Sequence, residues 1–347
     1  MKKLLLIVVT VILGAFCFTA CGTAETTGST TEKTDTDQAN VSTEQESPDT
    51  DKPVKVVTTI FPEYDWVREI AGDELSHVDI TMLLDNGVDL HSYQPTADDI
   101  MKISDCDLFI YVGGESDAWV EDALKEAVNK DMKVINLLDV LGSSIKEEEV
   151  VEGMEAEEEE ESEEGEEEPE YDEHVWLSLK NAKILCEAIA SDLADIDAAH
   201  ADVYKQNEQT YADKLEALDK KYQAAVKEGN KDTILFGDRF PFRYMVDDYG
   251  LKYYAAFVGC SAETEASFET ISFLAKKVDE LGLTSVLTIE KSDQKIAKTI
   301  IDNTKDKNQT ILTLDSMQST TSDDVKNGTT YLSIMENNLS VLKEALQ

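Results

Sequence analysis

Positive charge is scarce in this sequence. Its 347 residues include 31 Lys and Arg against 73 Asp and Glu, which gives a formal net charge of −42 at pH 7. A chain with that balance repels phosphate backbones, which argues against a nucleic-acid partner and favours cationic ones. Residues 147–173 contain 18 of the acidic residues and no basic residue. A segment so charged cannot bury a core, so we expect it to form a disordered acidic loop.

Cysteine and the common catalytic motifs are scarce as well. Of five cysteines, three fall in the part expected to fold, Cys106, Cys186 and Cys260, and their spacing matches no cysteine-based zinc motif. One disulfide among them stays open, but the apolar patterns around Cys106 and Cys186 favour buried free thiols. The sequence contains neither His-Glu-x-x-His nor Gly-x-Ser-x-Gly, which are signatures of metalloproteases and of α/β hydrolases.

Only one long apolar run occurs, and it lies at the N-terminus. Two lysines precede apolar residues 4–18, which is the pattern of a secretory signal peptide over 1–20 and is short for a membrane span. Cys21 follows Phe-Thr-Ala, which resembles the lipobox of bacterial lipoproteins, with Phe where Leu is usual. We therefore expect a lipid on Cys21, a flexible tether over 21–52, and a protein anchored outside the cell membrane. Ordinary cleavage followed by secretion is the alternative.

Strand and helix patterns alternate on both sides of the acidic loop. This alternation predicts an α/β fold with mostly parallel sheets. We expect two similar lobes, 53–178 and 230–347, joined by a helical linker over 179–229 whose long second helix is rigid. The segments "TTIFPEYDWVREIAG" and "LFGDRFPFRYMVDDYG" each run from a strand through Phe-Pro into an aromatic helix, which supports the likeness of the lobes. The predicted strands are 54–61, 77–84, 106–114, 132–140, 232–237, 252–259, 284–290 and 309–315.

Four polar residues stand where open parallel sheets place their ligands, in loops beyond strand ends or at helix starts. They are His91, His174, Asp238 and Glu290. Two imidazoles and two carboxylates can complete a four-ligand site for zinc or manganese. Each residue also has a plainer interpretation, because loop histidines and aspartates often cap helices and Glu290 could pair with Lys291. The other two histidines, at positions 77 and 200, we interpret as structural.

Several motifs carry a resemblance to a known family. "GVDLHSYQPTADD", "HVWLS", "FGDRFPFRYMVDDYGL" and "VLTIEKS", in this order behind a lipobox, resemble the metal-receptor proteins of bacterial ABC importers for zinc and manganese. The resemblance covers nearly all of 54–347. It implies a metal buried between the two lobes, with ligands at His91, His174, Asp238 and Glu290. The third position is His in zinc-type members and often Glu in manganese-type ones, so Asp238 is a departure from both.

The resemblance also implies a function. We expect a monomeric, lipid-anchored binding protein, not an enzyme, that captures Zn²⁺ and delivers it to a membrane ABC permease, with Mn²⁺ as the alternative cargo. Zinc-type members carry a His-rich loop just before the His-Val-Trp element. The acidic loop 147–173 lies in the same place and could gather cations weakly. The competing hypotheses are a secreted zinc hydrolase using the same residues and a receptor for an organic or siderophore ligand.

Overall fold

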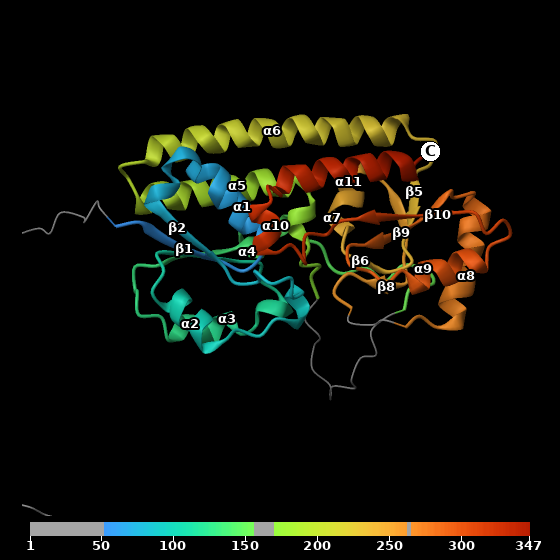
Figure 1. Cartoon of the computed structure of the whole chain (residues 1–347), viewed down its shortest axis with the longest axis horizontal. Coiled ribbons are helices and arrows are strands. Elements are labelled where there is room, and N and C mark those ends of the chain that lie inside the picture. Colours follow the sequence, from blue (N-terminus) through green and yellow to red (C-terminus); the bar gives the residue numbers. More distant parts are fainter. Residues whose placement is uncertain (1–51, 156–169, 262–264) are drawn as a thin grey trace, which may run out of the picture. The chain divides into compact units, whose positions relative to one another are not determined.

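A computed structural model describes residues 52–155, 170–261 and 265–347, and Figure 1 shows its ribbon. The predicted signal peptide, Cys21 and nearly all of the tether lie outside the described residues, as does the centre of the acidic loop, 156–169. Within the described ranges, none of the helices combines the length and the apolar character that crossing a bilayer requires.

The N-terminal half contains a four-stranded parallel sheet in the order β2-β1-β3-β4. Val54 pairs with Val78 at the amino ends of β1 and β2, and Thr58 pairs with Met82 at their carboxyl ends. The strands and the helices of this half are β1 (Val54–Thr58), α1 (Phe61–Ala71), β2 (Val78–Met82), α2 (Ala97–Ser104), β3 (Leu108–Tyr111), α3 (Val120–Lys125), β4 (Lys133–Asn136) and α4 (Leu137–Leu141).

Short 3₁₀ helices connect several of these elements. Two of them, η1 and η2, contain His77 and His91, which are discussed below. They are η1 (Gly72–His77), η2 (Leu90–Ser92), η3 (Glu115–Asp117), η4 (Gly142–Ser144) and η5 (Val175–Leu177).

The C-terminal half is built from parallel pairs of strands. β5 pairs with β7, β6 with β8 and β9 with β10, and a bridge between Phe236 and Leu287 continues from the end of β5 to β9. The elements of this half are β5 (Thr233–Leu235), β6 (Arg239–Phe240), α7 (Arg243–Tyr249), β7 (Lys252–Tyr254), β8 (Phe257–Val258), α8 (Phe268–Leu281), β9 (Ser285–Ile289), α9 (Lys295–Asp302), β10 (Thr310–Leu314), α10 (Ser322–Lys326) and α11 (Tyr331–Ala345).

The helical linker has the predicted form. α5 (Leu179–Ile196) is capped by Ser178, whose hydroxyl accepts from the Asn181 N–H at 3.1 Å. α6 (Ala201–Glu228) has 28 residues and spans about 42 Å. It lies against α5 and α1 of one half and α11 of the other (Figure 1). Its buried stripe, at the helical spacing of a core-facing side, is Tyr204, Tyr211, Leu215, Leu218, Tyr222 and Ala225.

The prediction of parallel α/β architecture is confirmed, while the division into two lobes stays a prediction. Residues Asp49–Gln347 form one compact unit, and the larger of two core clusters includes buried side chains from both halves, while the smaller lies within the C-terminal half. Val57 of β1, Tyr211 of α6 and Leu342 of α11 all belong to this cluster. The long helix therefore packs with both halves rather than standing alone between them.

Three local predictions differ from the structure. The strand expected over 132–140 ends at Asn136, because the Asn136 side chain accepts from the Asp139 N–H and starts α4. The strand expected over 252–259 is split into β7 and β8, which pair with different partners. The segment SDAWVEDALKEAVNK, 116–130, has a helical pattern along its whole length, but α3 begins only at Val120 and ends at Lys125.

The disorder expected for the whole acidic loop is wrong at both of its ends. Glu147 and Tyr171 form an antiparallel bridge, and the Glu148 N–H donates to the Glu170 carbonyl at 2.9 Å. Asp172 and Glu173 are buried despite their charge. Their contacts with the histidines, described below, supply the partners that buried carboxylates need.

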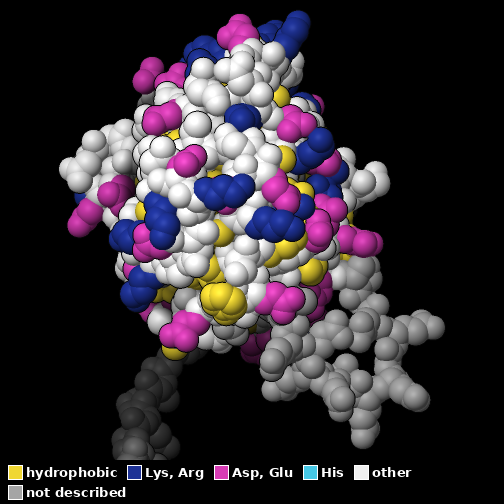
Figure 2. Space-filling view, turned by 90° about the vertical axis from the view of Figure 1, so that its right-hand side faces the viewer, with side chains coloured by type: hydrophobic (Ala, Val, Ile, Leu, Met, Phe, Trp, Pro, Cys, Tyr) yellow, Lys and Arg dark blue, Asp and Glu magenta, His cyan; other side chains and the backbone are white. Residues whose placement is uncertain are grey.

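The surface of the C-terminal half does not share the acidity of the whole chain. Figure 2 shows the side of the molecule that carries α8 and α9, where lysine and arginine side chains are interspersed with aspartate and glutamate. The negative charge is therefore not distributed evenly over the surface of the protein. This fits the clustering of carboxylates in the acidic loop, 147–173.

One buried carboxylate joins the two halves and generates a prediction. Asp65 of α1 is buried, and its oxygens accept from the Tyr331 N–H at the start of α11, at 2.8 Å, and from Arg68 at 3.1 Å. Burial raises the pKa of Asp65 to about 6, against the opposing effects of Tyr331 and Arg68. The folded protein therefore holds the Asp65 proton more tightly than the unfolded chain does.

Asp65 should make stability depend on pH. Its contribution is fully present below about pH 4 and is lost as pH rises through about 6, a change of about 3 kcal/mol. Asp65→Asn keeps an acceptor for the Tyr331 N–H but cannot ionise. Urea unfolding of both proteins from pH 4 to pH 8 should show the free energy of unfolding of the wild type falling relative to the variant. If the free energies of unfolding of the two proteins change equally with pH over this range, the raised pKa assigned to Asp65 is wrong.

Candidate metal centre

The structure brings two of the four predicted ligands together. His91 lies in η2, after the loop that follows β2, and His174 immediately precedes η5. Their Nε2 atoms are 3.2 Å apart, and their ring centroids are 5.1 Å apart. His174 is fully buried and His91 is nearly so. Two tetrahedral zinc ligands with bonds of about 2.0–2.1 Å stand about 3.4 Å apart, so the pair already has the spacing of a chelate.

Carboxylates fix the orientation of both imidazoles. Asp172 Oδ1 lies 3.0 Å from His174 Nδ1 and also accepts from the His174 N–H at 2.9 Å. His91 Nδ1 lies 2.8 Å from Ser116 Oγ and 3.4 Å from Glu173 Oε2. A carboxylate can only accept, so His174 carries its proton on Nδ1 and presents its Nε2 lone pair to His91.

The ionised state of Glu173 supports this arrangement. Burial would by itself raise the pKa of Glu173, but hydrogen bonds from His91 and Ser116 outweigh burial and hold that pKa below its usual value. The Ser116 N–H donates to Glu173 Oε1 at 2.9 Å. The His174 lone pair therefore faces His91 Nε2 across 3.2 Å, where a shared cation could take the place of a hydrogen bond between the rings.

A third atom that could bind a metal is the sulfur of Cys260, which was not among the predicted ligands. Its sulfur and one ring nitrogen of each histidine all lie within 4.8 Å of one another. The cysteine is a free thiol in the loop after β8, and its N–H donates to Glu148 at 3.1 Å. Burial, reinforced by nearby carboxylates, raises the pKa of the Cys260 thiol. A bound metal would stabilise the thiolate against both effects.

The two predicted carboxylate ligands have other partners. Asp238, beyond β5, accepts from the Arg239 N–H at 3.0 Å and the Ile289 N–H at 3.4 Å. Burial raises the pKa of Asp238. Glu290, at the end of β9, accepts from the Ser316 N–H at 2.7 Å and the Ser316 hydroxyl at 2.8 Å. In the part of the chain that the structure describes, neither belongs to a three-residue group of close ligand atoms. Their role as ligands stays a prediction.

Further polar residues surround the histidine pair. Gln318 Nε2 lies 3.4 Å from His91 Nε2, and Gln318 Oε1 accepts from Arg239 at 2.7 Å. Arg239 also pairs with Asp89, the residue whose side chain accepts from the His91 N–H. This chain of contacts connects the loop after β2 with β6 and the segment after β10. Residues from both halves of the sequence therefore position His91.

An acidic pocket of about 250 Å³ opens onto this centre. Its lining combines His91 and Cys260 with carboxylates from the ends of the acidic loop. The bridge between Glu147 and Tyr171 holds those ends together beside it. The lining residues are His91, Glu115, Ser116, Glu148, Glu170, Tyr171, Glu173 and Cys260.

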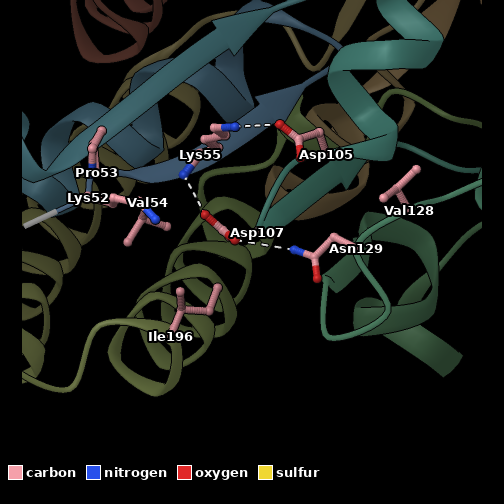
Figure 3. A pocket seen from close by; sticks show the side chains of 9 residues that line it. All are labelled: Lys52, Pro53, Val54, Lys55, Asp105, Asp107, Val128, Asn129 and Ile196. Carbon is pink, nitrogen blue, oxygen red and sulfur yellow. Dashed lines mark hydrogen bonds and ion pairs between the residues drawn. The ribbon is translucent and has the colours of Figure 1, made fainter. Parts of the chain in front are cut away.

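A larger pocket of about 440 Å³ has a different chemistry. It lies at the amino ends of β1 and β3, away from the histidine pair, and Figure 3 shows its lining. Lys55 pairs there with Asp105, and the Lys55 N–H donates to Asp107 at 2.9 Å. Asn129 donates to the other oxygen of Asp107 at 3.2 Å. Its carboxylates are already partnered and no imidazole or thiol lines it, so it does not suit a transition metal.

Comparisons with known proteins agree with this picture. Residues 56–345 match the family described as zinc-uptake complex component A, periplasmic (ZnuA). The zinc-binding protein AdcA of Streptococcus pyogenes serotype M6 is 30% identical over 294 residues, covering 84% of this chain and 55% of AdcA. The high-affinity zinc uptake system protein ZnuA of Bacillus subtilis is 29% identical over 96% of this chain and 95% of its own length. The chain thus spans about half the length of the AdcA proteins it matches.

Solved structures share the fold. The Zn(II)-bound ZnuA-like domain of Streptococcus pneumoniae AdcA superposes with a TM-score of 0.65 at 27% identity, covering 85% of this chain and 99% of that domain. The metal-dependent lipoprotein YcdH of Bacillus subtilis gives a TM-score of 0.67 at 26% identity, covering 84% and 99%.

The contact between Asp172 and His174 generates a prediction. Asp172→Asn keeps an acceptor near His174 Nδ1 but removes the charge that fixes the imidazole, which should weaken metal binding about 10–100-fold. Competition against a chromophoric chelator measures this affinity. The control Asp122→Asn removes the same charge from a highly exposed position on α3 and should leave the affinity unchanged. Equal affinities in the two variants would contradict the role given to Asp172.

Proposed function

Because the chain belongs to the family of periplasmic zinc-uptake complex A components, the ZnuA family, we propose that it captures Zn²⁺ outside the cell membrane and delivers it to an ABC permease. Family membership makes it a binding protein and removes the secreted hydrolase as a candidate. The predicted anchor at Cys21 and the monomeric state are part of this proposal.

The assembled group of His91, His174 and Cys260 carries the proposal. Two imidazoles and a thiolate are a soft ligand set, which suits zinc better than manganese. Two carboxylates in the predicted ligand set suit manganese, whereas Cys260 and the zinc-binding relatives favour zinc. In this proposal Asp238 and Glu290 complete the site only if they exchange their present backbone partners for the metal.

The acidic pocket gives the proposal a route for metal entry. Glu148 and Glu170 line it at the two ends of the acidic loop, next to His91 and Cys260. Carboxylates around a concave entrance raise the local concentration of cations and speed their association. We propose that the acidic loop collects Zn²⁺ at this entrance and that the histidine pair holds it.

Paired titrations of Zn²⁺ and Mn²⁺ into metal-stripped protein test the cargo and the ligands. We expect one tight zinc equivalent, lost in His91→Ala, and a preference for zinc that Cys260→Ser reduces because a hydroxyl is a harder, weaker ligand. Asp238→Asn and Glu290→Gln are nearly isosteric variants that weaken binding only if these carboxylates reach the metal.

Two outcomes of these titrations would overturn parts of the proposal. Tighter binding of Mn²⁺ than of Zn²⁺ under competition would reverse the cargo. Only weak, multiple binding that His91→Ala leaves unchanged would mean that the histidine pair holds no metal, and the receptor function would be wrong.

The entrance makes a separate kinetic prediction. The double variant Glu148→Gln/Glu170→Gln should slow zinc association by a factor on the order of 2–10, and more at low salt than at high salt, because the pocket loses two charges. Stopped-flow measurement with a fluorescent competitor gives this rate. The control pair Glu121→Gln/Asp122→Asn removes two exposed charges from α3, away from the pocket lining. If both pairs of substitutions lower the zinc association rate equally, net charge alone is the cause and the proposed role of the entrance is wrong.

A further inference from the structure

All four histidines of the chain occur as two pairs, and the second pair lies outside the centre described above. His77 ends η1 and His200 stands at the N-terminus of α6. Their ring centroids are 4.3 Å apart with an interplanar angle of 31°. Glu74 lies between them, since its Oε2 is 3.7 Å from the Nε2 atom of each ring. One ligand atom from each of these three residues falls within 4.8 Å of the others.

The tautomer of His200 follows from its neighbour. Asp197 Oδ2 lies 2.6 Å from His200 Nδ1 and also accepts from the Tyr204 hydroxyl at 2.8 Å. The Asp197 carboxylate accepts a hydrogen bond from Nδ1–H, so the Nε2 lone pair of neutral His200 points toward the Glu74 carboxylate. Two acceptors then face each other with no hydrogen between them, which a cation resolves. A carboxylate behind the imidazole is the usual outer partner of zinc-bound histidine.

The pair stands at the other end of the sheet from His91. His77 directly precedes Val78, which pairs with Val54 at the amino ends of β2 and β1. His91 follows the carboxyl end of β2, about 17 Å further along a five-residue strand. An ion at one pair therefore cannot share ligands with an ion at the other.

We propose that Glu74, His77 and His200 form a second site for a divalent transition metal, with Zn²⁺ as the fitting ion. Two imidazoles and one carboxylate leave a fourth position open to water, as in three-ligand zinc sites. The side chains of His77, Glu74 and His200 are 41%, 30% and 22% exposed, so the site is open to solvent and should bind more weakly than the buried centre. Contraction of the three ligand atoms by less than about 1 Å brings them to zinc-bonding distances.

Metal at this site would connect two elements that already touch. η1 packs on the first turns of α6, where Asn207 donates to the Ile70 carbonyl at 3.0 Å. An ion held by Glu74 and His77 on one side and by His200 on the other would fasten the start of α6 to the end of η1. Binding to the folded state alone would raise the unfolding temperature.

The double variant His91→Ala/His174→Ala isolates this site for a test, since no other histidine remains. Equilibrium dialysis against Zn²⁺ should find one bound equivalent in this variant. Adding His77→Gln should abolish its binding, and adding Asp197→Asn should weaken it about 10–100-fold. Adding Asp73→Asn, which changes an exposed carboxylate of η1, should leave it unaffected. Zinc should also raise the unfolding temperature of the isolating variant, and His77→Gln should abolish that rise. Far-ultraviolet circular dichroism confirms that each variant is folded.

The test of the second site is independent of the test of the proposed function. Zinc binding that is the same with and without His77→Gln, with no His77-dependent rise in unfolding temperature, would overturn it and leave only the acidic segments as weak binders. If the wild-type protein binds no tight equivalent of Zn²⁺, that result counts against the His91–His174 centre and not against the second site.

Discussion

The functional geometry depends on one constraint, that the Nε2 atoms of two imidazoles are held 3.2 Å apart. Asp172 and Glu173, adjacent in the chain, each lie beside the Nδ1 atom of one ring. The spacing of the pair therefore matches that of two tetrahedral zinc ligands before any ion enters, so binding requires little rearrangement of the rings.

The rest of the fold keeps that contact from relaxing. The parallel sheet places η2 and η3 side by side beyond its carboxyl edge, and η5 is anchored by Trp176, whose indole N–H donates to the Ser316 carbonyl at 2.8 Å. Tyr331 of α11 donates its hydroxyl to the Trp176 carbonyl at 2.7 Å. His174, which immediately precedes η5, and the last helix are thus parts of one hydrogen-bonded and packed structure. Local loop changes can occur around it, whereas a large separation of the halves would break a common core.

The sequence was sufficient for the parallel α/β class and for the long helical pattern of α6, because both depend on local pattern. It was insufficient where the outcome depends on long-range partners. Asp238 and Glu290 do lie at strand ends, but which hydrogen bonds their oxygens accept is decided by Ile289 and Ser316. Cys260 was missed although it directly follows a predicted strand. Applying the strand-end rule to thiols as well as to imidazoles and carboxylates would have found it. His77 and His200 are 123 positions apart in sequence, and no local pattern joins them.

The bridge between Glu147 and Tyr171 has a consequence for how this protein can vary. Together with the bridge between Glu155 and Phe257, it fixes both flanks of the central acidic residues, 156–169, so these can be lengthened, shortened or recoded without moving the residues on either side. Doubling the length of such a segment costs only about 0.6 kcal/mol in closure entropy. Under the proposed function, the residues that choose the ion and the residues that gather ions would therefore be separable, and the gathering segment could change while the chelating pair stays fixed.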